Sequence, residues 1–230
     1  MINIFIVNFN TIDLTNICIR SIIKNCGLKD YSINVFDNSN KQPFATSYNV
    51  NIIDNTKGQL IDLEKLVIKN LNGIPYKEGD YGSYKHCITI QYILDNYDNV
   101  LLFDSDIVLK KKIDFIDEDV ISVFGIEQRR IDSWGFLVEK RSVPFIHYFN
   151  TKKLRELNIR YFDNDRICCG SVPRKTETVY DTGASFLEDI QNYLGYKIIN
   201  HSEYINHLGH GSWKQHISLD KWKNLNRKFL

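Results

Sequence analysis

A short apolar run that ends in two carboxylates, residues 100–106 (VLLFDSD), constrains the fold of this chain more than any other segment. Such a run is typical of a buried strand in a mostly parallel sheet, and these strands carry ligand-binding side chains at their carboxyl ends. Strand alternation puts Asp104 and Asp106 on one face and turns Ser105 away. Two carboxylates so placed can share Mg²⁺ or Mn²⁺ on a phosphate. The alternative interpretation is a strand end followed by a turn, where aspartate is common.

Strand-like and helix-like patterns alternate along the first hundred residues. Alternation of this kind predicts βαβ units, and therefore an α/β fold with a mostly parallel sheet flanked by helices. The expected strands cover 2–7, 33–36, 50–53 and the segment from 100, and the expected helices cover 14–24, 59–71 and 84–96.

The second half has a looser pattern, with expected strands at 120–126 and 136–139 and expected helices at 152–157 and 184–194. We find no linker, repeat or low-complexity tract between the halves, and 230 residues suit one sizeable domain. We therefore expect a single domain over 1–230, in which the regular pattern of 1–109 and the looser pattern of 110–230 form two halves.

The composition excludes several classes of protein. The 29 Lys and Arg residues against 28 Asp and Glu give a net charge of +1, so no global field favours nucleic acid. No apolar run is long enough to span a bilayer and the amino-terminal residues read as a strand, so a cytoplasmic protein is expected. Five cysteines without Cys-x-x-Cys spacing indicate reduced, partly buried thiols rather than a disulfide framework or a zinc site.

Polar residues follow three of the expected strands: 8–11 (NFNT), 37–39 (DNS) and 104–106 (DSD). Because the carboxyl ends of parallel strands meet at one edge of a sheet, these residues are expected to line one crevice. For Asp37 the alternative interpretation is that its carboxylate caps a turn.

These segments, taken in order, resemble GT-A-fold glycosyltransferases, and the family-2-like enzymes in particular. The resemblance runs from Ile4 to Trp213 and rests on 7–11 (VNFNT), 35–39 (VFDNS), 103–106 (FDSD), 180–186 (YDTGASF) and 207–213 (HLGHGSW). It implies a GT-A-type, Rossmann-like fold in which 1–109 form the nucleotide-binding half and 110–230 the acceptor-binding half with a C-terminal segment. It also implies metal-dependent, inverting transfer of a sugar from a nucleotide-diphosphate donor to a hydroxyl of a glycan or similar acceptor.

On the donor side the resemblance makes Asp106 the direct ligand of Mn²⁺ or Mg²⁺, with Asp104 reaching the ribose or the metal through water. Asp37 would accept a hydrogen bond from the ring N–H of the base, which favours a UDP-sugar. The remaining donor-site residues that it implies are Asn8, Phe9, Asn10, Thr11 and Ser105.

Glycosyl transfer also needs a carboxylate that takes the proton of the attacking hydroxyl. Asp181 is the first choice, because it precedes a glycine and a helix start where anionic groups are favoured. The alternative is that Asp181 only supplies charge to that helix. Glu188 and Asp189, further into the helix, are the substitutes.

Histidines supply further candidates. His207 resembles the third metal ligand more than His210 does, and Trp213 beside them is expected to cover the diphosphate or stack on a sugar. Ser83 and His86 open the helix before the carboxylate strand and are candidate donor contacts. The competing interpretations are structural histidines, a packing aromatic and an ordinary helix cap.

Two basic features stay open. Arg129, Arg130 and Arg141 either meet an anionic acceptor or phosphate, or serve solubility. The tail 221–230 mixes basic and aromatic residues, so it either makes peripheral membrane contact or packs back on the domain, and the second is favoured.

Two other functions compete with transfer. The segment 104–109 (DSDIVL) also resembles the opening motif of haloacid-dehalogenase-type phosphatases, but a hundred βα-patterned residues precede it and no later Gly-Asp-x-x-x-Asp completes a magnesium site. A sugar-nucleotide pyrophosphorylase is disfavoured because 8–11 contain no glycine. A non-catalytic sugar-nucleotide-binding module would bind a donor without turnover.

Overall fold

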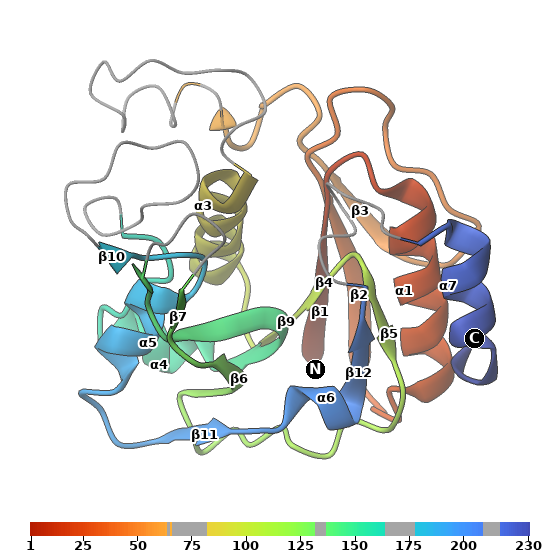
Figure 1. The fold of residues 1–230 in the computed structure, drawn as a ribbon. Helices are drawn as coiled ribbons and strands as arrows, with labels where there is room; N and C mark the ends of the chain where they lie inside the picture. The colour runs from red at the N-terminus through yellow and green to blue at the C-terminus, as the bar shows by residue number, and fades with distance from the viewer. Residues whose placement is uncertain (64, 66–81, 132–136, 164–177, 209–216) are drawn as a thin grey trace.

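The fold, seen here in a computed structural model, is built on a seven-stranded sheet (Figure 1). The described residues are 1–63, 65, 82–131, 137–163, 178–208 and 217–230. The strand order is β11-β6-β9-β4-β1-β2-β3, in which β9 is antiparallel to both neighbours and the other four pairs are parallel. The predicted α/β class with a mostly parallel sheet is confirmed, and strands from both halves of the chain share this sheet.

The first half supplies the parallel part of the sheet. Its elements are β1 (Ile2–Asn8), α1 (Ile12–Asn25), β2 (Tyr31–Asp37), β3 (Asn51–Asp54), α3 (Gly82–Asn96) and β4 (Val100–Asp104). Alternate strand residues face opposite layers: Ile4 and Ile6 pack with α1, whereas Phe5 packs with α3. Because both of its faces are covered, β4 is apolar from Val100 to Phe103, as the sequence predicts, whereas the edge strand β3 is mostly exposed.

The second half completes the sheet and its surroundings. Its elements are β5 (Ile107–Leu109), β6 (Ser122–Glu127), β7 (Arg130–Ile131), β8 (Leu137–Val138), β9 (Arg141–Phe149), α4 (Thr151–Glu156), β10 (Thr178–Val179), α5 (Ala184–Ile190), β11 (Tyr196–Ile198), α6 (His201–Tyr204), β12 (Ile205–His207), α7 (Leu219–Leu225) and the 3₁₀ turn η1 (Arg227–Phe229). A separate two-stranded sheet pairs β5 with β12.

The structure departs from the expected elements, and three of the differences concern the sheet and its covering helices. The central strand β9 was not predicted, because Pro144 lies within it and proline removes a ladder donor; the β6–β9 register shifts between Phe124 and Ile126. The helix expected over 184–194 ends earlier, at Ile190. The helix expected over 59–71 falls largely outside the described residues.

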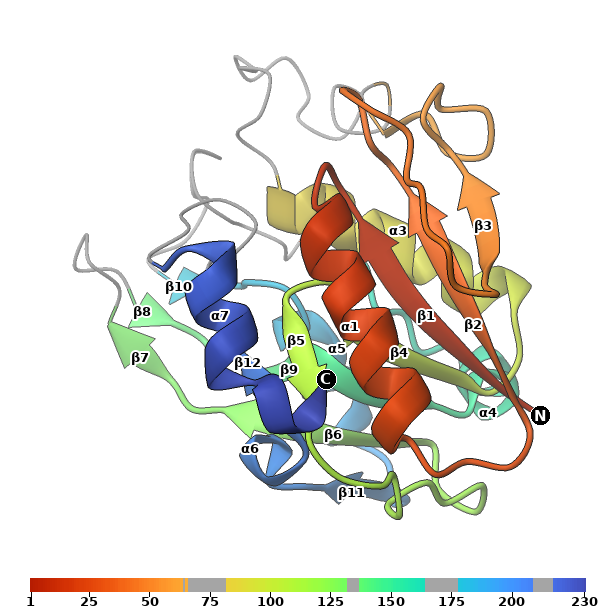
Figure 2. The same ribbon diagram turned by 90° about the vertical axis from the view of Figure 1, so that its right-hand side faces the viewer.

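The C-terminal segment packs back on the domain, as the favoured interpretation held. Figure 2 shows α7 beside α1, and Trp222 is buried against Leu14, Ile17 and Val108. Among the described helices, none combines the length and the apolar character that crossing a membrane requires. Cys18, Cys26 and Cys87 are buried free thiols, as expected, while the two remaining cysteines lie outside the described residues.

Candidate metal centre and donor site

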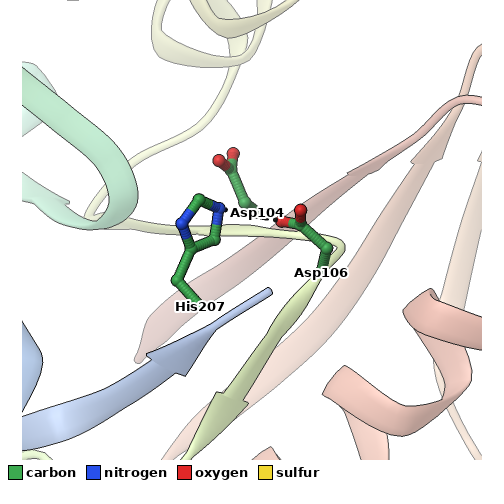
Figure 3. A group of neighbouring side chains, drawn as sticks. All are labelled: Asp104, Asp106 and His207. Carbon is green, nitrogen blue, oxygen red and sulfur yellow. Dashed lines mark ion pairs between the residues drawn. The ribbon is translucent and has the colours of Figure 1, made fainter. Parts of the chain in front are cut away.

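Two carboxylates and one imidazole come together at the carboxyl end of β4. Asp104 is the last residue of β4, and a tight turn places Asp106 directly before β5. The pairing of β12 with β5 sets His207 opposite Ile107, so that His207 Nε2 lies 3.2 Å from Asp106 Oδ1. One ligand atom from each of the three residues lies within 4.8 Å of the others (Figure 3). We expected Asp104 and Asp106 to lie on one face of a continuous strand. They do lie close together, but the turn at residues 105–106 brings them there.

The electrostatics of this group suit a bound cation. Burial raises the pKa of Asp104, and the nearby charge of Asp106 raises it further, against the opposing effects of His86, His207 and Arg141. Burial alone would lower the pKa of His207, but its hydrogen bond to Asp106 and the charges of both carboxylates raise it. Two oxygen donors and one nitrogen donor form a set that Mn²⁺ accepts and that Mg²⁺ accepts less readily, since imidazole is the softer ligand.

Two neighbouring side chains fix the orientation of this group. The ring of Phe145, on β9, stacks on the His207 imidazole with centroids 3.8 Å apart and an angle of 25° between the planes. On the other side, His86 Nε2 from α3 lies 3.6 Å from Asp104 Oδ1. His86 therefore lies next to the end of β4, and its expected contact with the donor stays a prediction.

Asn8, at the end of β1, is the centre of a buried hydrogen-bond network on the donor side. Its Nδ2 donates to Asp37 Oδ1 and to Ser39 Oγ, both at 2.8 Å. Its Oδ1 accepts from the hydroxyls of Thr15 at 2.8 Å and Thr11 at 3.0 Å. Asn8 itself is fully buried, so it shapes the loop after β1 rather than offering its amide to a ligand.

The loop after β1 reaches the metal group. A hydrogen bond of 3.1 Å joins the hydroxyls of Thr11 and Ser105 and links this loop to the turn between the two carboxylates. Asn10 adopts a left-handed conformation with φ 58° and bonds Asn40, whereas the Phe9 side chain is 43% exposed. Phe9 thus offers an exposed aromatic side chain on this loop.

Asp37 is enclosed by the chain itself. It is 1% exposed, its Oδ1 accepts from Asn8 and Ser39, and its Oδ2 accepts from the backbone N–H of Phe44 at 2.7 Å. These bonds hold the segment after β2 in place, which is the turn-capping alternative. The contact of Asp37 with a base stays a prediction.

The candidate base Asp181 is held in an ion pair. Its Oδ2 lies 2.6 Å from Arg141 Nη1, and its Oδ1 accepts from the backbone N–H of Thr182 at 2.7 Å. Arg141, at the start of β9, also bonds Glu127 at 2.5 Å, and its side chain is 11% exposed. The charge of Arg141 acts on Asp104 and His207 as well as on Asp181, so this guanidinium is electrostatically coupled to both groups.

The other site residues predicted from the sequence are not brought to the metal group, or lie outside the description. Glu188 and Asp189 lie on α5, where Glu188 is exposed and its Oε1 accepts from Tyr180 Oη at 3.5 Å. His210, Trp213 and the side chain of Ser83 lie outside the described residues.

Two residues that shape the site, Arg141 and Phe145, were not predicted from the sequence to lie there. Arg141 was one of three arginines read as acceptor contacts or solubilising charges, and Phe145 was not considered. Both lie on β9, so recognising that strand despite Pro144 would have placed them on one chain segment leading to the site.

Comparison of the fold with solved structures finds several glycosyltransferases, the class that the sequence resembles. GlyE from Streptococcus pneumoniae aligns with TM-score 0.41 and 12% identity over 87% of this chain and 45% of its own. The galactosyltransferase LgtC, solved with donor and acceptor sugar analogues, gives 0.45 and 14% over 86% and 73%. TarS from S. aureus, solved with UDP-GlcNAc, gives 0.45 and 14% over 99% and 65%. This chain thus spans less than half the length of GlyE.

No protein-family model matches the chain, and no curated protein matches it either.

Proposed function

We propose that this chain is a metal-dependent glycosyltransferase that moves a sugar from a nucleotide-diphosphate donor, a UDP-sugar, to a hydroxyl of a glycan or similar acceptor. The observation that supports it is the group of Asp104, Asp106 and His207 at the carboxyl end of a parallel strand, next to the loop after β1. Ligands of open parallel sheets bind at this edge. In this proposal 1–109 bind the donor and 110–230 the acceptor.

Asp106 and His207 are the direct ligands of the cation, and Asp104 contacts it or the ribose. A bound Mn²⁺ or Mg²⁺ would act as a Lewis acid toward the departing diphosphate. Phe145 keeps the His207 imidazole in its plane by stacking, and Thr11 holds the turn through Ser105. These contacts pre-organise the ligand set before the donor arrives.

Asp181 is the base that takes the acceptor proton in an inverting displacement. Arg141 and the Thr182 N–H each hold one of its oxygens, and each oxygen retains a lone pair for the acceptor hydroxyl. The side chain is 21% exposed, so the carboxylate is accessible from one side. The supporting observation is its link through Arg141 to the metal group.

A screen of UDP-, GDP-, CMP- and TDP-sugars by thermal shift, with and without Mn²⁺, tests the donor class. Manganese-dependent stabilisation by one UDP-sugar, followed by release of UDP with an acceptor, is the expected result. Asp106→Asn should abolish both, whereas the exposed Asp119→Asn serves as the matched control. Binding without turnover would support a binding module, and metal-dependent release of inorganic phosphate from a phosphomonoester would support the phosphatase alternative.

A further inference from the structure

Three segments that carry lysines and arginines but no acidic side chain meet at one end of the molecule: 14–25, 107–113 and 221–230. Asn25, at the end of α1, joins them. Its Nδ2 donates to the carbonyl of Leu109 at 2.9 Å and to that of Phe229 at 2.8 Å. Lys24 Nζ donates to the carbonyl of Lys228 at 3.2 Å. The cations of the three segments are therefore gathered in space although they are far apart in the sequence.

This convergence produces what we call the basic face: Arg20, Lys24, Lys110, Lys112, Lys223, Arg227 and Lys228. The whole chain carries a net charge of only +1, so the face is a local concentration and does not reflect a generally basic protein. Glu203 pairs with Lys111 at 3.5 Å at the margin of the face, and Asp13 lies within the face beside Arg20 and Lys223.

Lys110 feels the other cations of this region. Burial lowers the pKa of Lys110, and the charges of Lys228 and Lys111 lower it further, against the opposing effect of Glu203. Repulsion of this kind destabilises the free protein, and an anionic partner would relieve it.

A hollow opens within the basic face, between α1 and α7. Its volume is about 440 Å³, and Arg20, Lys223 and Arg227 line it together with Asp13, Asn16 and Tyr48. Three cations against one carboxylate leave an excess of positive charge, and the amide and the phenol add hydrogen-bond donors, which suits a phosphate-bearing head group.

Exposed apolar side chains on α1 and α7 favour a membrane over a soluble anion as the partner of the basic face. Ile23 on α1 is 47% exposed and Leu225 on α7 is 61% exposed. Figure 2 shows the two helices side by side on the same face of the molecule. Protein surfaces that lie in the interface of an anionic bilayer typically combine apolar side chains with lysines and arginines. We propose that the basic face docks the protein on a membrane that contains anionic phospholipid.

Vesicle flotation with the full chain tests the proposal and needs no substrate. The protein should float with vesicles of equal parts phosphatidylcholine and phosphatidylglycerol, should stay behind with pure phosphatidylcholine, and should be released by added sodium chloride. Arg20→Glu/Lys223→Glu/Arg227→Glu changes three exposed residues and should lower the partition coefficient at least roughly a hundredfold.

The matched control Lys57→Glu/Lys65→Glu/Lys152→Glu makes the same change in net charge at exposed positions away from α1 and α7. It should lose much less binding than the first variant. Equal losses, equal binding to both vesicle types, or binding to RNA or soluble inorganic phosphate without vesicle binding would each overturn the proposal. Donor binding and turnover are measured separately, so a failure here leaves the proposed transferase function untouched.

Discussion

Arg141 determines what the carboxylate of Asp181 can do. A buried guanidinium needs paired charge, and Glu127 and Asp181 supply it from two different segments. One partner, Glu127, keeps Arg141 in place, so Asp181 receives a fixed cation and a fixed orientation. The same arrangement would be a purely structural ion pair if no acceptor approached Asp181, and kinetics separate these two roles.

Asp181→Asn keeps the shape and one hydrogen-bond acceptor but removes the base. We expect donor affinity to be unchanged and transfer to fall by about 10²- to 10⁴-fold, the usual contribution of a general base. Isothermal titration with UDP and Mn²⁺ gives the affinity, and UDP release with an acceptor gives the rate. Asp189→Asn on α5 is the matched control and should retain activity. A collapse of donor affinity in the Asp181 variant would show that Asp181 is not an acceptor-side base.

His147 makes the stability of the fold depend on pH. It lies on β9 with its ring fully buried against Phe149, and burial lowers its pKa well below the usual value. Ser122 Oγ donates to the carbonyl of Tyr148 and lies 2.8 Å from His147 Nε2, so Nε2 carries the imidazole proton. Among the described residues, no group bonds its Nδ1. Protonation of the folded protein would place an unpaired charge in the core.

Below about pH 6.5 the unfolded chain protonates this histidine while the folded protein does not, so stability falls as the pH drops. The slope from His147 is at most about 1.4 kcal/mol per pH unit. His207 has a raised pKa and acts in the opposite sense, losing stability as the pH rises. Urea unfolding of the wild type and His147→Gln between about pH 5 and pH 8 isolates the first effect. Parallel curves for the two proteins would contradict the assignment.

Among the secondary-structure elements, the apolar strands and amphipathic α1 follow from the sequence, whereas β9 does not. The run 100–103 is buried on both faces, so its composition alone identifies it. In β9 a proline interrupts the pattern, and the register between β6 and β9 shifts around it. The short strand β12 has no pattern of its own, and its pairing with β5 is tertiary.

The same contrast applies to the candidate site. The carboxylates of Asp104 and Asp106 could be predicted because a strand end brings them close along the chain. The position of His207 could be suggested only by resemblance, since about a hundred residues separate it from Asp106 and spacing says nothing about such a contact. The bond of Asp181 to Arg141 could not be predicted, because it depends on the unpredicted strand β9.

Gly183 joins the Asp181 loop to β9. It caps α5 with φ 84°, and a Cβ there would lie 2.3 Å from the carbonyl oxygen of Ser142. The Ser142 N–H and hydroxyl both donate to the Gly183 carbonyl, at 3.2 and 3.1 Å, so the loop and the strand are close enough to exclude any side chain.

Gly183→Ala should therefore destabilise the protein by about 3 kcal/mol or more, from left-handed strain plus the backbone clash. Gly58→Ala has a similar φ of 68°, but its nearest contact would be 3.5 Å, so strain alone should cost it about 1 kcal/mol. Urea unfolding measures both variants. Equal losses would mean that the close packing of Gly183 on Ser142 contributes nothing.

In the whole molecule, the metal group connects the two halves of the chain. Asp104 and Asp106 end the parallel half, whereas His207 comes from β12, close to the C-terminal segment. In the free protein, the charge of Asp106 and the His207 imidazole already attract each other. A cation bound to all three side chains would take the place of this attraction between Asp106 and His207. The three side chains come together only in the folded state, so the cation binds the folded protein more tightly than the unfolded chain.

Mn²⁺ should consequently raise the free energy of unfolding, by about 2.7 kcal/mol at a concentration of one hundred times its Kd. His207→Gln should weaken the Mn²⁺ affinity roughly tenfold to a hundredfold, because an amide replaces the imidazole ligand. His201→Gln, on the neighbouring helix α6, is the control and should keep the wild-type affinity. Electron paramagnetic resonance of free Mn²⁺ gives the Kd, and urea unfolding gives the stability. If His207→Gln bound Mn²⁺ as tightly as the wild type, the metal would be held by the carboxylates of the first half alone, and the two halves would not be linked through it.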